Sequence, residues 1–329
     1  MQKRKKIVST IIKVLIGLGS FFIIYLRLKS DLTSEKLQLL ISLAFSLKGL
    51  ICLSICLLLI PVNWGIESFK WKIITEPVEK ISFKTATYSV YSGICLGNLA
   101  PGRATEFLAK IIFFKIENRP KITALHFING MFQLCITYLF GLTALLFQLK
   151  QFEGDNMWLA YTTSTIAILI FAVFIFCLVK IDLILSFITK KISKQQSLEN
   201  FKYPFTAKKL IQLFGLSVIR YCIFALQFLL LIYLFHQQPL NFSIFVGMAL
   251  YYLITTTIPM ISVLEGPIRA AIALIVFHDS GISDSALALS SVLIWLINII
   301  LPSIYGYSIL LKQNFEPIAI GFKLFGKQK

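Results

Sequence analysis

The stretch GNLAPGRATE at residues 97–106 places a proline, an arginine and a glutamate between two apolar segments. A second stretch, TTTIPMISVLEGPIR at residues 255–269, has the same character. A charged side chain at membrane depth costs about 2.5–3.5 kcal/mol on insertion scales, so it is usually retained for a function. Because proline and glycine interrupt helices, both stretches predict broken helices instead of continuous spans.

The surrounding composition is that of a membrane protein. The chain has 329 residues, 57% of them hydrophobic and 14% charged, and its mean hydropathy is +0.81. Several segments reach the roughly 20 apolar residues needed to cross a bilayer core, and a helix satisfies its own backbone hydrogen bonds in lipid. We therefore predict an all-α, polytopic membrane protein without a separate soluble domain.

The apolar segments divide into full spans and interrupted regions. Two regions, 83–118 and 241–278, each combine an apolar arm, a polar break and a second arm, and we interpret both as re-entrant or broken-helix hairpins. The basic start resembles a signal peptide, but its apolar run continues to Leu26, so we interpret it as a membrane span. The six predicted full spans are 7–27, 38–62, 122–149, 157–180, 209–235 and 284–311.

The basic residues predict the orientation of these spans. Lysine is concentrated in the N-terminus and in the segments 63–84, 115–121, 181–208 and 313–329, whereas 151–156, 236–241 and 279–284 contain neither lysine nor arginine. The positive-inside rule then places both termini in the cytoplasm of a cell-membrane protein. The formal net charge of +17 fits cytoplasmic loops near anionic lipid and does not indicate a nucleic-acid partner.

The predicted order of spans is repeated. The order is two spans, one hairpin and a third span. This order occurs twice, with opposite orientation in the membrane, in half-repeats at about 1–149 and 157–312. The hairpins match in length, because Pro101 follows Ser82 by nineteen positions and Pro259 follows Leu240 by nineteen positions. Such an inverted-topology repeat is common among secondary transporters. We expect one membrane domain over 1–329, with 181–208 as a cytoplasmic loop between the halves and 313–329 as a cytoplasmic tail.

The first break carries residues suited to an anionic ligand. Pro101 and Gly102 predict that a new arm begins here with free N–H groups, which attract phosphate or carboxylate. Arg103 adds a planar guanidinium. Glu106, three residues further on, is placed to hold Arg103 or to relay a proton. Asn98 precedes the break within an apolar segment.

The second break repeats the pattern. Glu265 and Arg269 are four residues apart, and Pro259 and Pro267 flank the break. A purely structural role, in which each acid and arginine lock a loop tip, is about as plausible for a single pair, but two equivalent hairpins favour a substrate path. The predicted path comprises Asn98, Pro101, Arg103, Glu106, Glu67, Pro259, Glu265 and Arg269.

Other polar residues have simpler interpretations. Glu67 lies among Trp64, Lys70 and Trp71, where the tryptophans indicate an interfacial anchor and Glu67 is also placed to approach the first hairpin. Amides within the spans indicate hydrogen bonds between helices, and Arg220 is the weakest candidate for a polar cavity. The six cysteines all lie in apolar stretches and indicate packing. We expect no metal site, catalytic triad or cofactor.

These motifs resemble a known family. Trp71, Gly93, Gly97 and the P-x-R-x-x-E core at 101–106, followed by E-G-x-x-R at 265–269, resemble the lysylphosphatidylglycerol synthase transmembrane-region family of flippase-like proteins. The resemblance covers nearly the whole chain. It implies a domain that, in the fused synthases, translocates an aminoacylated lipid, and stand-alone members are linked to polyprenyl-phosphate sugar metabolism.

Three functions remain open at this point. The favoured one is a flippase-like transporter that moves an anionic phospholipid or a polyprenyl-phosphate lipid across the bilayer. The second is a membrane-embedded enzyme or accessory subunit of polyprenyl-phosphate sugar metabolism, with Arg103 holding phosphate and Glu106 or Glu265 as acid or base. The third is a scaffold for envelope-biosynthesis enzymes. Because no polar region is long enough for the soluble aminoacyl-transfer domain of the synthases, we do not expect a lysyl transferase.

Overall fold

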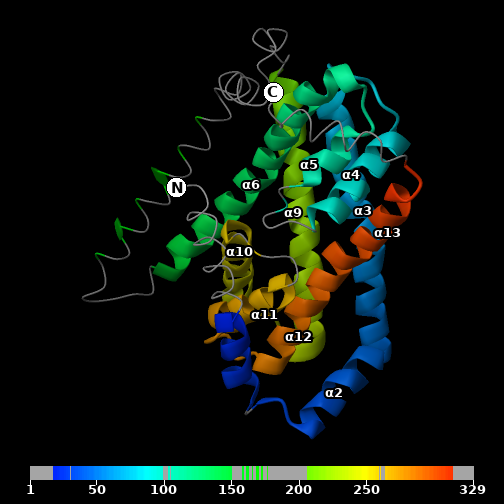
Figure 1. Ribbon diagram of the computed structural model, residues 1–329. Coiled ribbons are helices and arrows are strands. Elements are labelled where there is room, and N and C mark those ends of the chain that lie inside the picture. The colour runs from blue at the N-terminus through cyan, green and yellow to red at the C-terminus, as the bar shows by residue number, and fades with distance from the viewer. Residues whose placement is uncertain are drawn as a thin grey trace, which may run out of the picture. The chain divides into compact units, whose positions relative to one another are not determined.

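The computed structural model describes residues 18–29, 31–98, 103, 105–149, 206–258, 260 and 264–313, together with isolated positions between 158 and 176. Within these residues every regular element is a helix and no strand occurs, so the all-α prediction is confirmed (Figure 1).

Four helical segments of the described chain are long and apolar enough to cross a membrane. They contain α3 (Leu47–Thr75), α6 (Arg119–Leu149), α9 (Ala207–His236), and the continuous run of α12 (Asp284–Trp295), the π-helical turn η5 (Leu296–Ile300) and α13 (Leu301–Leu310). The spans predicted at 122–149, 209–235 and 284–311 are therefore confirmed as helices. The predicted spans 7–27 and 157–180 lie largely outside the described residues, so the count of six stays a prediction.

The span predicted at 38–62 is wrong in its bounds. Helix α2 (Ser34–Phe45) ends at Ser46, whose backbone is extended. The Ser46 hydroxyl donates to the Leu43 carbonyl and accepts from the Gly49 amide, so this side chain separates α2 from α3. Helix α3 then continues through Pro61 to Thr75, into the segment that its polar residues had predicted to be a loop.

Both predicted hairpins consist of two helical arms separated by a break. The first contains α4 (Phe83–Gly97) and α5 (Glu106–Ile111), followed by the 3-10 turn η2 (Ile116–Asn118). The second contains α10 (Phe242–Thr257) and α11 (Glu265–Val276). In each hairpin the two arms pack against one another. Side chains cap both first arms, since Ser82 accepts from the Thr85 amide and Asn241 from the Ile244 amide.

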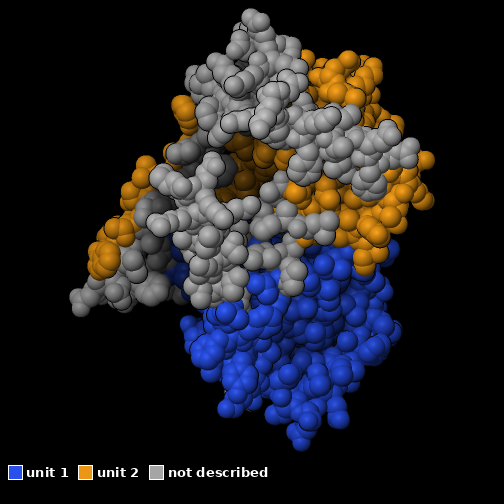
Figure 2. Space-filling model, viewed as in Figure 1, with its two compact units in different colours: residues 1–61, 140–153, 222–301 blue, residues 62–139, 154–221, 302–329 orange. Residues whose placement is uncertain are grey.

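The chain divides into two compact units (Figure 2). Unit 1 comprises residues 1–61, 140–153 and 222–301, and unit 2 comprises residues 62–139, 154–221 and 302–329. Unit 1 contains the second hairpin, α10 and α11, and unit 2 contains the first hairpin, α4 and α5. Each unit therefore combines parts of long helices with one broken helix.

Aromatic residues form the centre of unit 1. The rings of Phe228 and Tyr251 lie 4.7 Å apart, and those of Phe228 and Phe277 lie 6.1 Å apart at nearly a right angle. All three side chains are buried. The first pair is tilted and the second is edge-to-face. Aromatic contacts of this kind add to the energy of burial, so they fix α9, α10 and the end of α11 together.

The core of unit 2 joins the first hairpin to its neighbours. Trp71 is fully buried and lies 5.9 Å from the ring of Phe114 and 6.3 Å from that of His126. Gly306 of α13 lies directly against the backbone carbonyl of Tyr91 in α4, where a Cβ atom would collide. These contacts hold α4 beside α13 and position the short helix α5.

Candidate functional site

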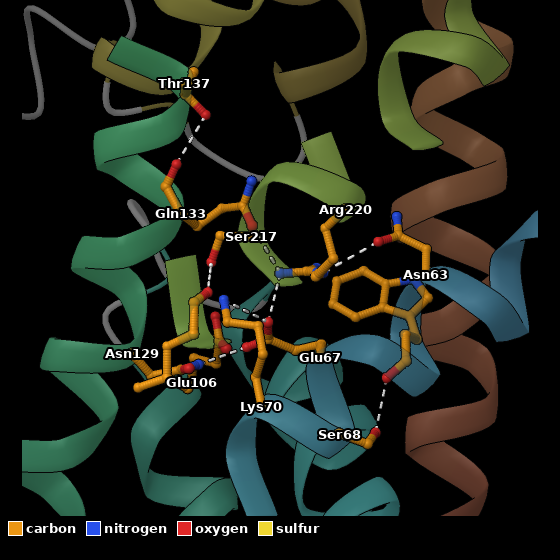
Figure 3. A network of polar contacts seen from close by, with 12 residues as sticks. Asn63, Glu67, Ser68, Lys70, Glu106, Asn129, Gln133, Thr137, Ser217 and Arg220 are labelled. Carbon is orange, nitrogen blue, oxygen red and sulfur yellow. Dashed lines mark hydrogen bonds and ion pairs between the residues drawn. The ribbon is translucent and has the colours of Figure 1, made fainter. Parts of the chain in front are cut away.

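A network of buried polar side chains lies in unit 2, and Glu67 of α3 is at its centre (Figure 3). Its Oε1 accepts a hydrogen bond from Asn129 Nδ2 at 2.7 Å, and its Oε2 accepts one from Arg220 Nη1 at 2.5 Å. Lys70 Nζ lies 3.5 Å from Oε2. Glu67 is only 6% exposed. Its carboxylate therefore depends on these protein groups, which come from three helices, instead of on water.

Arg220 of α9 extends the network. Its Nε donates to Asn63 Oδ1 at 3.1 Å, and its Nη1 also donates to Gln133 Oε1 at 3.3 Å. The guanidinium lies 5.2 Å from the ring centroid of Trp64, within range of a cation–π interaction. Arg220 therefore connects α9 to α3 and α6 through charge-assisted hydrogen bonds.

A second buried ion pair lies beside this network, on α5. Lys110 Nζ is 2.7 Å from Glu106 Oε1 and 5.1 Å from the ring centroid of Trp71. Trp71 Nε1 donates to Ser89 Oγ at 2.9 Å, and Ser89 Oγ donates to the Lys110 carbonyl at 3.0 Å. Glu106 and Glu67 interact electrostatically, so the two ion pairs belong to one cluster.

Glycine in α4 makes room for this pair. A Cβ atom at Gly93 would lie 2.8 Å from Lys110 Cγ. Only glycine therefore lets the lysine stem pack directly on the backbone of α4 without displacement. The Lys110 side chain is 2% exposed as a result, and its ammonium is held at the Trp71 ring.

The structure changes the partner expected for Glu106. Glu106 pairs with Lys110, one helical turn further along α5, where the i, i+4 spacing places both side chains on one face. Arg103 precedes α5 and its φ is +55°, a left-handed conformation that costs an L-residue energy. The half-buried Arg103 interacts electrostatically with both Glu106 and Arg220.

The pair predicted in the second hairpin lies in unit 1. Arg269 Nε and Nη2 lie 3.0 Å and 2.9 Å from Glu265 Oε1. Arg269 also interacts with Tyr251, whose hydroxyl lies 2.9 Å from Ser291 Oγ. The i, i+4 spacing thus predicted this contact, whereas its role in a substrate path stays a prediction.

The other predicted site residues have mixed outcomes. Asn98 ends α4, where its side-chain amide donates to Ser303 of α13. Glu67 is the centre of the network. Pro101 and Pro259 lie outside the described residues. The interfacial interpretation of the tryptophans is wrong, because Trp64 is 5% exposed and Trp71 is fully buried within unit 2.

Sequence reasoning also missed two cations of the cluster. Lys70, which lies between the two tryptophans interpreted as an interfacial anchor, is fully buried, and so is Lys110, which the sequence analysis does not include in the predicted path. Their i, i+3 and i, i+4 spacing from Glu67 and Glu106 was the available signal. Among the residues that the structure describes, no group of three or more His, Cys, Asp or Glu side chains could hold a metal ion.

Comparison with known proteins supports the resemblance expected from the motifs. Residues 10–306 match the sequence family described as the lysylphosphatidylglycerol synthase TM region. The matched range includes both hairpins and every residue of the Glu67 network. No curated protein matches the chain.

Proposed function

Because the chain belongs to the lysylphosphatidylglycerol synthase transmembrane-region family, whose members are lipid-related membrane proteins, we propose that it is a flippase-like transporter. Its cargo is a lipid with an anionic headgroup, either a phospholipid or a polyprenyl-phosphate lipid. The transport takes place across the cell membrane.

The observation that carries this proposal is the buried charge cluster of unit 2. Charged side chains inside an apolar helical protein are costly, and they mark substrate or ion paths in transporters. Glu67, Lys70, Lys110 and Arg220 are each less than 9% exposed. The cluster joins three helices to the arm of a broken helix, which is the kind of element that forms substrate sites in transporters.

The two hairpins support a repeated transport architecture. Each has a capped first arm, a break, and a second arm that begins with an acid. We propose that the hairpins enter the membrane from opposite sides within half-repeats at about 1–149 and 157–312, with both termini in the cytoplasm. Arg103 and Arg269 would then attract a headgroup, and Glu106 and Glu265 would gate its movement.

A translocation assay tests the proposed function. The purified protein is reconstituted into vesicles that contain fluorescent phosphatidylglycerol, and dithionite then quenches the label in the outer leaflet. We expect proteoliposomes to lose inner-leaflet fluorescence over time, whereas protein-free vesicles keep it. Retained inner-leaflet fluorescence with phosphatidylglycerol, and equally with a labelled polyprenyl phosphate, would contradict the proposal. Chemical conversion of the labelled lipid would favour the membrane-embedded enzyme instead.

A further inference from the structure

The buried cluster of unit 2 contains more positive than negative charge. Its described cations are Arg103, Lys70, Lys110 and Arg220, and its described carboxylates are Glu67 and Glu106. Buried charge is tolerated when it is paired. The excess of cations therefore calls for an anion that the protein itself does not supply among these residues.

Lys70 is the cation with the weakest compensation. Both oxygens of Glu67 already accept shorter bonds, from Asn129 at 2.7 Å and from Arg220 at 2.5 Å. The Lys70 ammonium has three N–H donors and lies 3.5 Å from Glu67, at the limit of a hydrogen bond, while its side chain is 0% exposed. Glu67 is thus satisfied without Lys70, whereas Lys70 is not satisfied by Glu67.

A donor with no partner in the described part of the chain lies on the same face of α3 as Lys70. Asn63, Glu67 and Lys70 are spaced i, i+4 and i+7, which places them in one row along the helix. Asn63 is fully buried, and its Oδ1 accepts from Arg220. Its Nδ2 group has no hydrogen-bond partner among the described residues. The face therefore presents one buried donor without an acceptor among the described residues, Asn63 Nδ2, and one whose single acceptor among them is distant, Lys70 Nζ.

We infer that Lys70 is a further anion-binding residue of this cluster and that its ligand is a phosphate ester of a lipid headgroup. An anionic phosphate oxygen would accept from the Lys70 ammonium and replace its long contact with Glu67, with the Asn63 amide as a further donor. Arg220 stays bound to Glu67 and holds the helices in place. This inference rests on the proposed function, because it names the chemistry of the transported headgroup.

Ligand-dependent stabilisation of the purified protein tests the inference. A ligand that binds the folded state raises the unfolding midpoint, so the midpoint is measured in nonionic detergent during titration with dihexanoyl-phosphatidylglycerol or with sodium phosphate at constant ionic strength. The variant is Lys70→Met, and the matched control is Lys72→Met, two residues further along α3. Wild type and Lys72→Met should be stabilised, whereas Lys70→Met should bind about tenfold more weakly, as loss of one charge-assisted hydrogen bond implies.

The two titrations distinguish the sources of phosphate. If both ligands raise the unfolding midpoint, the site recognises the phosphate group itself. If only dihexanoyl-phosphatidylglycerol raises it, the site recognises phosphate as part of a lipid headgroup. A second variant, Glu67→Gln, removes the carboxylate that competes for Lys70 and should bind either anion more tightly than wild type. Equal affinity of Lys70→Met and wild type would overturn the inference, as would the absence of any anion-dependent shift in wild type.

Transport and binding can fail separately. If wild type translocates lipid and Lys70→Met binds anions as tightly as wild type, the role of Lys70 is overturned and the proposed function stands. If Lys70→Met loses anion binding but wild type does not translocate lipid, the proposed function is overturned and the anion site at Lys70 stands.

Discussion

The Arg220 guanidinium of α9 lies 2.5 Å from the Glu67 carboxylate of α3, and both side chains are buried although 153 positions separate them in the sequence. This contact gives Arg220 a structural role that differs from that of Lys70. Arg220 completes the carboxylate and bonds two amides, whereas Lys70 lies at the margin of the same network. The two cations should therefore respond differently to replacement.

Replacing Arg220 should destabilise unit 2 strongly. In Arg220→Met the Glu67 carboxylate loses its shortest bond, and breaking a buried pair in this way costs about 3–5 kcal/mol. Thermal unfolding in detergent should show a large fall in midpoint. The double variant Glu67→Gln/Arg220→Met should recover part of that loss, because it no longer contains the orphaned carboxylate. A double variant that is less stable than wild type by the full sum of the two single losses would contradict a direct pair.

Replacing Lys70 should be far less harmful. Lys70→Met removes an undercompensated buried ammonium and fills its space with an apolar side chain of similar length, while Glu67 keeps its bonds to Asn129 and Arg220 and is not left as an orphaned charge. The unfolding midpoint without added anion should therefore equal or exceed that of wild type. A fall as large as that of Arg220→Met would show that Lys70 is an essential structural partner of Glu67.

The close contact between α4 and α13 should depend on Gly306. In Gly306→Ala the new methyl group meets the Tyr91 carbonyl, which belongs to backbone and cannot rotate away, so we expect a loss of about 1–3 kcal/mol. Gly130→Ala in α6 is the control, because nothing lies within 4 Å of its Cβ position, and it should gain up to about 1 kcal/mol from helix propensity. Comparable unfolding midpoints for the two variants would contradict the packing.

Asp31, which lies outside the membrane spans, should contribute stability that depends on pH. Burial raises the pKa of this carboxyl, but bonds from Lys36 and from the Ser285 amide at 2.7 Å outweigh it, so the pKa is lowered from the ordinary value of 3.8. A carboxyl with a lowered pKa stabilises the fold above its unfolded pKa and loses this effect as the pH falls through its folded value.

The measurement is the difference in unfolding midpoint between wild type and Asp31→Asn. This difference should be constant at pH values well above 3.8. It should shrink as the pH falls through 3.8, where the unfolded chain takes up the proton, until Asp31 is also protonated in the folded state. Glu35→Gln, at an exposed position of α2, serves as the control. A difference that grows on acidification would contradict the assignment of Asp31 as a stabilising anion.

The helical architecture was predictable because it depends on local patterns. Long apolar runs predicted α6, α9 and the run from α12 to α13, and prolines beside charges predicted both breaks. The bounds of α3 were not predictable in the same way. Its C-terminal half carries Asn63, Glu67, Lys70 and Lys72, which resemble a solvated loop until the partners of Asn63 and Glu67 on α6 and α9 are known.

The candidate site was predictable only where partners are close in sequence. The Glu265–Arg269 contact follows from its i, i+4 spacing, whereas the Glu67–Arg220 contact depends on how α3 and α9 pack. The sequence placed Arg103 beside Glu106 because both flank the break. Glu106 instead pairs with Lys110, a contact that the i, i+4 spacing could have predicted, whereas the left-handed backbone at Arg103 and the packing of Lys110 on Gly93 could not be predicted. Neither backbone feature is visible in a single sequence.

The translocation rate of Arg103→Gly tests the central claim most directly, because this substitution separates function from folding. Glycine relieves the left-handed conformation at φ +55°, which should keep or raise stability by about 1 kcal/mol, while the cation is lost. Gln237→Gly is the matched control, since residue 237 has a φ of +60° and lies outside the cluster.

Removal of a charged group that contacts the headgroup during transport should lower the translocation rate at least about tenfold. We predict that Arg103→Gly proteoliposomes, folded and as stable as wild type, translocate anionic lipid at least about tenfold more slowly, whereas Gln237→Gly proteoliposomes keep the wild-type rate. Wild-type translocation by Arg103→Gly would contradict a substrate path at the first hairpin.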